Sequence, residues 1–258
     1  MDERIELGGI VTNCWEEFYR RNAERYAHVT GNCLQSVAIS STHPQLTGDW
    51  DLVERLIQLA PGPKGLDAGC GAGARDVRRC LARGYDITGI DAVEEVVRVT
   101  HEMYPELRER VLTTDLRKPL PFEDDAFDFA LSVSVLQHIE SQVVHQVTLP
   151  ELARVLRPGG VLLLAFKRGK GTASVYDTHY EEKRHFLLYD EHEVLATLYS
   201  CGMGLIHSLS AKELGGLMYC TDVKGLRYCA FLAGKQPVPN RNRDMGLEKA
   251  PSWRLSLP

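Results

Sequence analysis

The sequence predicts an α/β protein with a mainly parallel sheet, and two observations support this. Short apolar runs alternate with amphipathic stretches of helical length through most of the chain. Glycine-containing stop signals, Arg83-Gly84 and Pro158-Gly159-Gly160, end two of the helical stretches. Because parallel strands need a long crossover between them, strands separated by helices are typical of βαβ units.

The apolar runs give the expected strands in chain order. They are Gly65–Ala68, Ile87–Ile90, Val111–Thr114, Phe127–Ser132, Val161–Phe166, Leu205–Leu209 and Tyr228–Leu232. The expected helices show apolar residues on one face or lie between those strands. They are Cys14–Tyr26, Asp51–Leu59, Ala74–Arg83, Glu94–Tyr104, Leu149–Leu156 and Glu191–Cys201.

Composition divides the chain into three expected parts. Residues 1–60 combine two helices with the polar, turn-rich segment Val29–Gly48, and we expect a helical cap over a site. Residues 61–234 form the expected main domain. Residues 235–258 hold four prolines and few apolar residues, so we expect a mostly disordered tail.

Charge and composition exclude several classes of protein. The 258 residues carry a net charge of −5, which argues against a whole-protein electrostatic grip on nucleic acid or an anionic membrane. The longest apolar run, Val161–Phe166, is too short to span a membrane, and the charged start, MDERIELGG, does not resemble a secretory signal. The seven cysteines include no CxxC pair, so we expect reduced thiols, no metal site and a cytoplasmic location. Oligomeric state stays open.

A glycine-rich turn follows the first expected strand of the main domain. In the segment Gly65-Leu-Asp-Ala-Gly-Cys-Gly-Ala-Gly-Ala, residues Gly69, Gly71 and Gly73 let the backbone turn tightly and approach a ligand closely. Gly69, Gly71 and Ala74 also satisfy the dinucleotide pattern G-x-G-x-x-G/A. The turn alone therefore indicates a nucleotide-like ligand without identifying it.

Two acidic residues at the ends of the following strands extend this pattern. Asp91 lies 22 residues after Gly69 and is placed to accept from both hydroxyls of a ribose, in NAD or in an adenosyl ligand. It can also cap the helix that follows. Asp115 ends the third strand at the same sheet edge, where its carboxylate can accept from an adenine amine.

The chain resembles the class I S-adenosylmethionine-dependent methyltransferases of the small-molecule type. Four blocks match in order and spacing, LDAGCGAG, GID, TTD with LPFEDDAFD, and RVLRPGG, and the resemblance covers residues 15–234. It implies a Rossmann-like, seven-stranded, mostly parallel sheet with an antiparallel last strand and helices on both faces. It also implies S-adenosylmethionine as cofactor, S-adenosylhomocysteine as product and a small-molecule acceptor.

The resemblance implies roles for individual residues. Asp67, Gly69, Gly71 and Gly73 would line the methionine part of the cofactor, and the Ser132 carbonyl would accept from its ammonium group. The other implied cofactor contacts are Asp91 to the ribose, Ala92 or Val93 against the adenine, Asp115 and the Leu116 backbone at the adenine amine, and Tyr26 over the carboxylate.

Catalytic residues are harder to assign, because the cofactor itself activates the methyl group. The family often has two adjacent histidines after its fourth strand; here Gln137 precedes His138. His138 is a base candidate or only shapes the pocket, and Gln137 and Tyr26 are the other catalytic candidates. Further substrate-side candidates are Tyr19, His28, Lys167, Arg168, Tyr176, His179, Tyr180 and His185. We expect the run Glu181–Arg184 to be a solvated turn. Lys167-Arg168, with Gly169 and Gly171, is either a flexible anion-contacting loop or an ordinary basic loop, and the ordinary loop is favoured.

Methyl transfer to N or O of a small molecule is the favoured function, with other readings open. An NAD(P)-dependent oxidoreductase would leave Asp115 and RVLRPGG without a role, and the chain lacks the expected Tyr-x-x-x-Lys pair at Tyr176. A methyltransferase for protein or RNA is a second alternative, although the acidic balance disfavours RNA. A non-catalytic cofactor-binding partner protein is a third, because binding and catalysis use different residues.

Overall fold

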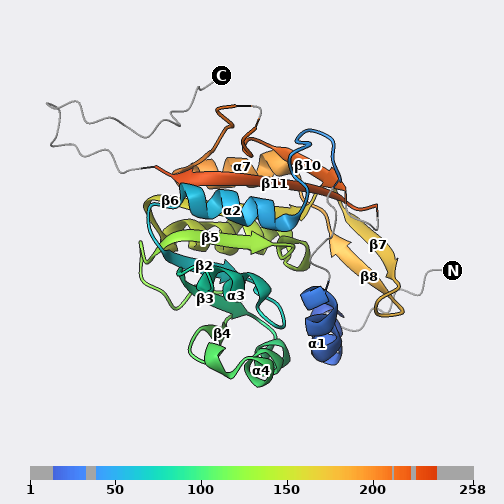
Figure 1. The fold of residues 1–258 in the computed structure, drawn as a ribbon. Helices are drawn as coiled ribbons and strands as arrows, with labels where there is room; N and C mark the ends of the chain where they lie inside the picture. Colours follow the sequence, from blue (N-terminus) through green and yellow to red (C-terminus); the bar gives the residue numbers. More distant parts are fainter. Residues whose placement is uncertain (1–13, 33–38, 211, 222–224, 237–258) are drawn as a thin grey trace, which may run out of the picture.

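Buried apolar strands form the centre of the molecule. The computed structural model describes residues 14–32, 39–210, 212–221 and 225–236. Five strands pair in parallel, in the order β4-β3-β2-β5-β6 (Figure 1). They are β2 (Lys64–Ala68), β3 (Asp86–Asp91), β4 (Val111–Thr113), β5 (Phe127–Val133) and β6 (Leu156–Lys167). These five confirm the first five predicted strands, with small shifts at their ends.

The last strand of the sheet runs antiparallel, as predicted. β11 (Arg227–Lys235) pairs antiparallel with β6, and β9 (Met203–Leu205) pairs with the far end of β11. The predicted strand Leu205–Leu209 was wrong in its bounds, because β9 ends at Leu205 and the chain then turns. Two further strands, β1 (Ile39–Ser40) and β10 (Met218–Thr221), extend the edge beside β11.

Helices cover both faces of the sheet. Leucines of α6 (Leu149–Val155) and α7 (Glu191–Ser200) pack with Leu66 and Phe231 on one face. On the other face, α2 (Asp49–Leu59), α3 (Arg75–Leu81) and α4 (Glu94–Met103) contribute Leu56, Val77 and Val97 to a second apolar cluster. Because helices cover both faces, a ligand of such a sheet is expected at the carboxyl ends of the parallel strands.

The first helix lies differently from the second. α1 (Cys14–Asn32) packs on α4, where Ala23 and Ala27 contact Val96 and Val99. By contrast, Leu52, Val53 and Leu56 of α2 are buried against the sheet. The division into a cap over 1–60 and a domain over 61–234 stays a prediction. The predicted tail lies, apart from residues 235 and 236, outside the described residues.

A β-hairpin follows β6 and was not predicted. β7 (Thr172–Asp177) and β8 (Glu182–Leu187) pair antiparallel in a separate two-stranded sheet beside α1 (Figure 1). The prediction of a solvated turn over Glu181–Arg184 was wrong. Only Glu181 lies in the turn, whereas Arg184 is mostly buried and pairs with the fully buried Asp177 at 3.1 Å. A buried carboxylate explains this, because it needs a cationic partner.

Lys167 and Arg168 do not form the loop expected of them. Lys167 is the last residue of β6, only 4% exposed, and its ammonium lies over the rings of Phe186 and Tyr228 at 4.4 and 4.1 Å. Arg168 forms an ion pair with Glu191 at 3.0 Å. The prediction of an ordinary basic loop was therefore wrong for both residues.

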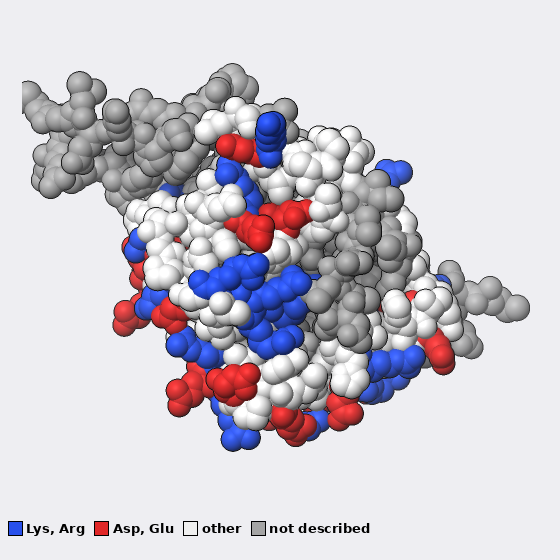
Figure 2. All heavy atoms as spheres, viewed as in Figure 1, with Lys and Arg blue, Asp and Glu red and all other residues white. Residues whose placement is uncertain are grey.

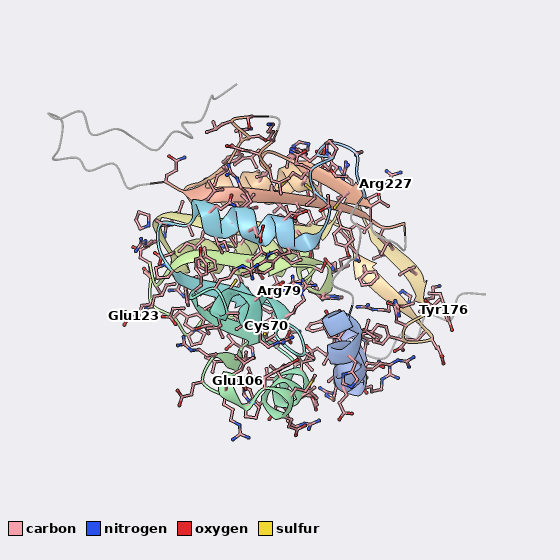
Figure 3. The ribbon with its side chains drawn as sticks, in the orientation of Figure 1. Cys70, Arg79, Glu106, Glu123, Tyr176 and Arg227 are labelled. Carbon is pink, nitrogen blue, oxygen red and sulfur yellow. The ribbon has the colours of Figure 1, made fainter. Side chains whose placement is uncertain are left out.

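Charges of both signs are interspersed on the face shown in Figure 2. Basic side chains gather over α3, and acidic groups lie above and below them. Arg79 and Arg83 lie over the Trp50 ring at 4.8 and 4.6 Å, and Arg83 also pairs with Glu54. Both arginines therefore have partners within the chain. Figure 3 shows Arg79 lying over the body of the molecule.

Candidate functional site

The glycine turn joins the ends of β2 and β3. The φ angles of Gly69, Gly71 and Gly73 are +95°, +65° and +81°, a region that glycine adopts without strain. The N–H of Gly69 donates to the Ile90 carbonyl at 2.8 Å. A Cβ at Gly71 would lie 3.0 Å from the Tyr26 ring. The turn thus presents bare backbone directly beneath a residue of α1.

Asp91, the last residue of β3, faces this turn. Its Oδ2 accepts from the N–H of Gly71 at 3.1 Å, and its Oδ1 accepts from the N–H of Val93 at 3.0 Å. Burial raises the pKa of Asp91 to about 6, although these backbone N–H groups pull it down. Each oxygen keeps a further lone pair for a ligand.

Asp115 follows β4 and is held by an arginine. Its Oδ1 and Oδ2 accept from Arg117 Nε and Nη2 at 2.8 and 2.9 Å. Burial raises the pKa of Asp115, but the hydrogen bonds from Arg117 outweigh it and hold the pKa below its ordinary value. Arg117 also pairs with Glu16 of α1 at 2.6 Å and lies 5.4 Å from the Trp15 ring. Arg117 therefore links α1 to the residues that follow β4.

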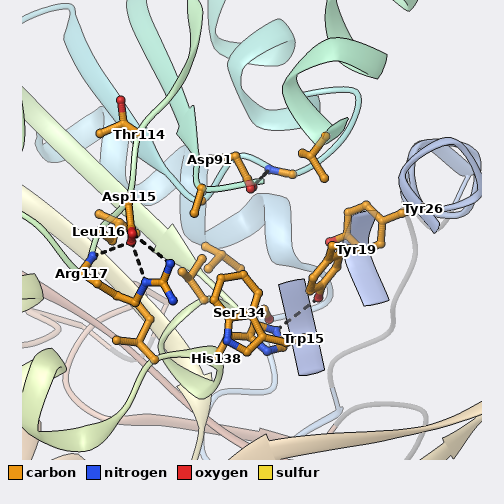
Figure 4. A pocket seen from close by; sticks show the side chains of 17 residues that line it. Trp15, Tyr19, Tyr26, Asp91, Thr114, Asp115, Leu116, Arg117, Ser134 and His138 are labelled. Atoms are coloured by element: carbon orange, nitrogen blue, oxygen red, sulfur yellow. Dashed lines mark hydrogen bonds and ion pairs between the residues drawn. The ribbon is translucent and has the colours of Figure 1, made fainter. Parts of the chain in front are cut away.

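These groups surround one pocket, closed on its outer side by aromatic rings of α1 (Figure 4). Trp15, Tyr19 and Tyr26 come from that helix, and His138 comes from the short helix η2 (Leu136–His138). The lining comprises Trp15, Tyr19, Tyr26, Gly69, Gly71, Asp91, Ala92, Val96, Thr114, Asp115, Leu116, Arg117, Val133, Ser134, Val135, His138 and Ile139.

His138 lies in an aromatic environment. Its ring centroid is 5.7, 5.4 and 5.7 Å from those of Trp15, Tyr19 and Phe186. Nε2 lies 3.2 Å from the Tyr19 hydroxyl, and Nδ1 is buried without a hydrogen-bond partner among the described residues. Burial, followed by the cations of Arg184 and Lys167, lowers the pKa of His138 well below its ordinary value. The imidazole is therefore neutral at physiological pH.

The structure brings most of the predicted site residues together. The pocket lining includes Tyr26, Gly69, Gly71, Asp91, Ala92, Asp115, Leu116 and His138. Their individual roles stay predictions. The remaining predicted residues, Asp67, Gly73, Ser132 and Gln137, are not part of this lining.

Those four residues contact the protein as follows, and their predicted roles stay predictions. Ser132 Oγ donates to the Ala68 carbonyl at 3.0 Å, and the Gly73 N–H donates to Thr100 Oγ1 at 2.9 Å. Gln137 is 2% exposed and donates to the Ser134 carbonyl at 2.8 Å. Asp67 is also buried, and burial and the neighbouring Asp76 raise its pKa.

The lining also includes residues that sequence reasoning missed. Trp15 precedes Tyr19 by four positions in α1, a spacing that places both on one helix face, so helical periodicity offered a signal. Arg117 follows Asp115 by two positions, but nothing in the local sequence indicates its bond to Glu16. Ser134, two residues beyond Ser132, has φ +61° as the chain leaves β5.

The substrate-side candidates divide by position. Tyr19 lines the pocket, and His185 lines a neighbouring cavity. Tyr180 is buried, whereas Tyr176 is 59% exposed and points outward from the hairpin (Figure 3). His28 is exposed on α1. His179 and Arg168 line neither cavity.

Comparison with known proteins identifies the class to which this fold and pocket belong. Residues 66–164 match the family model described as a methyltransferase domain. This stretch of the chain is therefore a methyltransferase domain of that family.

Relatives with this domain differ in what they act on. The chain is 35% identical over 112 residues to 2-methyl-6-phytyl-1,4-hydroquinone methyltransferase of Synechocystis, covering 43% of this chain and 34% of that protein. It is 33% identical over 104 residues to demethylmenaquinone methyltransferase of Staphylococcus aureus, covering 40% and 42%. The chain thus spans less than half the length of these two relatives.

Solved structures share the fold at low identity. The 1,6-didemethyltoxoflavin-N1-methyltransferase of Burkholderia thailandensis, solved with its substrate and S-adenosylhomocysteine, has a TM-score of 0.58 at 17% identity, covering 92% of this chain and 98% of that one. The (4+2) cyclase SpnF has a TM-score of 0.60 at 19% identity, covering 87% and 96%. These likenesses establish the fold alone.

The described residues contain neither a membrane-spanning helix nor a cluster of metal ligands. None of the described helices is long and apolar enough to cross a membrane. In the same part of the chain, no three His, Cys, Asp or Glu side chains are grouped so that they could hold a metal ion.

Proposed function

We propose that the chain is an S-adenosylmethionine-dependent methyltransferase that transfers a methyl group to N or O of a small molecule. One observation carries the proposal. The glycine turn, Asp91 and Asp115 line one pocket at the carboxyl edge of the sheet, and His138 and the aromatic face of α1 close it. Ligands of open α/β sheets bind at this edge.

The groups present fit the proposed cofactor. The free lone pairs of Asp91 suit two ribose hydroxyls, and Ala92 and Leu116 offer apolar surface for a flat base. Asp115 remains ionised beside Arg117 and can accept from an amine. Gly69 and Gly71 line the pocket without side chains, which leaves space for the amino-acid end to approach the backbone closely.

The bound cofactor would supply a methyl group already activated on a sulfonium, so the protein mainly aligns the acceptor and excludes water. Trp15, Tyr19 and Tyr26 exclude water from one side of the pocket. His138 lies beside two cations that oppose its protonation. It is therefore better suited to orient an acceptor through a hydrogen bond than to hold a proton taken from it.

Calorimetric titration of S-adenosylmethionine, S-adenosylhomocysteine and NAD tests the cofactor. We expect micromolar affinity for both adenosyl ligands, none for NAD, and at least a tenfold loss with Asp91→Ala. Asp86→Ala is the matched control, because Asp86 begins the same strand at the opposite sheet edge and pairs with Arg110. NAD binding, or equal losses in both variants, would contradict the proposal.

Turnover needs a second experiment, because cofactor binding alone does not show catalysis. Methyl-labelled S-adenosylmethionine is incubated with small-molecule phenols, amines and carboxylates, and separately with protein and RNA. We expect label to transfer only to small molecules. Transfer to protein or RNA would replace the acceptor class, and cofactor binding without any transfer would favour a non-catalytic role.

A further inference from the structure

A second cavity adjoins the cofactor pocket and shares its wall. Trp15, Tyr19 and His138 line both cavities. The second cavity has a volume of about 130 Å³. This is close to an engineered cavity of about 150 Å³ that binds benzene, so it has room for one aromatic ring. Its lining comprises Trp15, Phe18, Tyr19, Arg21, His138, Glu182, Lys183, Arg184 and His185.

The hairpin strand β8 brings a buried cation to this cavity. The side chain of Arg184 is 12% exposed. Its guanidinium lies 4.4 Å from the Phe18 ring centroid and 5.0 Å from that of Phe186. Aromatic faces stabilise a desolvated guanidinium. Asp177, behind it, is its ion-pair partner.

Cationic side chains outnumber carboxylates among the residues that line the cavity. Three cationic side chains line it, those of Arg21, Lys183 and Arg184, against one carboxylate, that of Glu182. Glu182 pairs with Arg21 at 3.2 Å, and Asp177 pairs with Arg184. Lys167 adds a further cation next to Phe186, which contacts His138. Cations therefore outnumber carboxylates in the lining itself, and Glu17, Glu182 and Asp177 lie against its two arginines.

Two hydrogen bonds connect Arg184 to His138 through the Tyr19 hydroxyl. Arg184 Nη2 donates to the Tyr19 hydroxyl at 2.6 Å, so that oxygen already serves as an acceptor. The hydroxyl hydrogen is then free to be donated to His138 Nε2, 3.2 Å away. In a neutral imidazole this leaves the proton on Nδ1, which has no partner among the described residues. The buried Nδ1–H is therefore an unsatisfied donor on a residue that lines the cavity.

We propose that this second cavity receives the methyl acceptor, and that the acceptor is an aromatic compound bearing an anionic oxygen. The rings of Trp15, Phe18 and Tyr19 suit its ring, and Arg184 and His138 suit its oxygen. An ammonium group would meet cations and donors instead, and is disfavoured. This inference rests on the proposed function, because it assigns the acceptor side of the same site.

Matched ligands test the proposal on the full chain saturated with S-adenosylhomocysteine. The anionic probes are 4-nitrophenolate and benzoate at pH 8. Their uncharged matches are 4-nitroanisole, methyl benzoate and 4-nitroaniline. We expect the anions to bind at least tenfold more tightly than their matches. Equal binding, or no binding of any probe, would overturn the proposal.

Variants show whether Arg184 causes the preference. Arg184→Met is combined with Asp177→Asn, so that no buried carboxylate loses its partner. We expect the double variant to lose the tenfold preference and Tyr19→Phe, which keeps the ion pair, to lose part of it. The control Arg98→Met with Glu102→Gln removes an exposed ion pair of α4. A preference that survives in the folded double variant would also overturn the proposal.

Cofactor binding is measured first in every sample, which separates the two proposals. Failure of wild-type protein to bind S-adenosylhomocysteine would contradict the proposed function, and the probes would still be titrated into the free chain. Cofactor binding without anion preference would contradict the acceptor class alone. Circular dichroism establishes that each variant is folded.

Discussion

The backbone N–H of Gly71 donates to Asp91 Oδ2 at 3.1 Å, so the glycine turn and the end of β3 form one unit. The carboxylate that would hold a ribose also holds the turn that would approach the cofactor. A change in the charge of Asp91 should therefore alter both the affinity for the cofactor and the free energy of unfolding.

Affinity for the cofactor should fall in mild acid. The pKa of Asp91 is about 6, and its ionised form is the better acceptor for ribose hydroxyls. We expect the affinity for S-adenosylhomocysteine to weaken as pH falls from 7.5 to 5.5, by about threefold to tenfold. Calorimetry across this range measures it, with Asp91→Asn as a control whose affinity should be weak and nearly constant. A wild-type affinity that does not change would contradict the prediction.

Asp91→Asn should stabilise the protein at pH 7.5. Burial raises the pKa of Asp91 in the folded state from an ordinary value of 3.8, so between about pH 4 and 6 the folded protein binds more protons than the unfolded chain. The contribution of Asp91 to stability therefore decreases as pH rises through that window. We expect the effect of Asp91→Asn on the free energy of unfolding to be about 2 kcal/mol more favourable at pH 7.5 than at pH 4, because the asparagine does not titrate and the hydrogen bond it loses is absent at both pH values. Urea unfolding at both pH values is the measurement.

His138 should contribute with the opposite sign. The pKa of His138 is lowered in the folded state, so the unfolded chain takes up a proton first as pH falls below about 6.5. Stability from this residue is present above that pH and lost below it. Between pH 7.5 and 5.5 we expect the wild type to lose about 1 kcal/mol of unfolding free energy relative to His138→Gln. His28→Gln, at an exposed position of α1, is the control, and an equal shift there would refute the assignment.

Gly71 and Gly84 allow the effect of backbone strain to be separated from the effect of contact with Tyr26 of α1. Both have positive φ, +65° and +83°, but an added Cβ meets Tyr26 at Gly71 and open space at Gly84. We expect each alanine variant to lose about 1 kcal/mol of stability from strain. Only Gly71→Ala should also weaken S-adenosylhomocysteine binding, by tenfold or more. Equal affinities in the two variants would show that the Tyr26 contact has no role.

Arg117→Met should loosen α1. The change removes the ion pair to Glu16 at 2.6 Å and the bonds to Asp115, while it keeps much of the apolar length of the side chain. We expect amide hydrogen exchange in residues 15–29 to accelerate severalfold. Arg98→Met, on the exposed face of α4, should leave exchange in α1 unchanged. Protection that persists in Arg117→Met would mean that the apolar contacts with α4 hold the helix alone.

The parts of the fold that local sequence encodes could be predicted. The strands β2 to β6 are apolar runs bounded by turn residues, and the residues Gly69, Gly71 and Asp91 follow them at fixed spacing. Arg184 illustrates what local sequence does not contain. It lies in a charged run, and its burial depends on Phe18 and Tyr19, 165 or more residues away. The two serines at the end of β5 are a different case. Ser132 lies within the strand and is buried, whereas Ser134 lies beyond it with φ +61° and lines the pocket, a change of backbone direction that the local sequence does not indicate.

The hairpin that delivers Arg184 lies wholly outside the stretch, 66–164, that matches the methyltransferase family. The hairpin part of the proposed acceptor cavity therefore lies outside the matched stretch, whereas the glycine turn, Asp91 and Asp115 lie within it. A change confined to β7 and β8 would alter the proposed acceptor cavity and leave those cofactor-side residues unchanged. A chimaera that carries another relative's hairpin would be the corresponding route to engineering a new acceptor range.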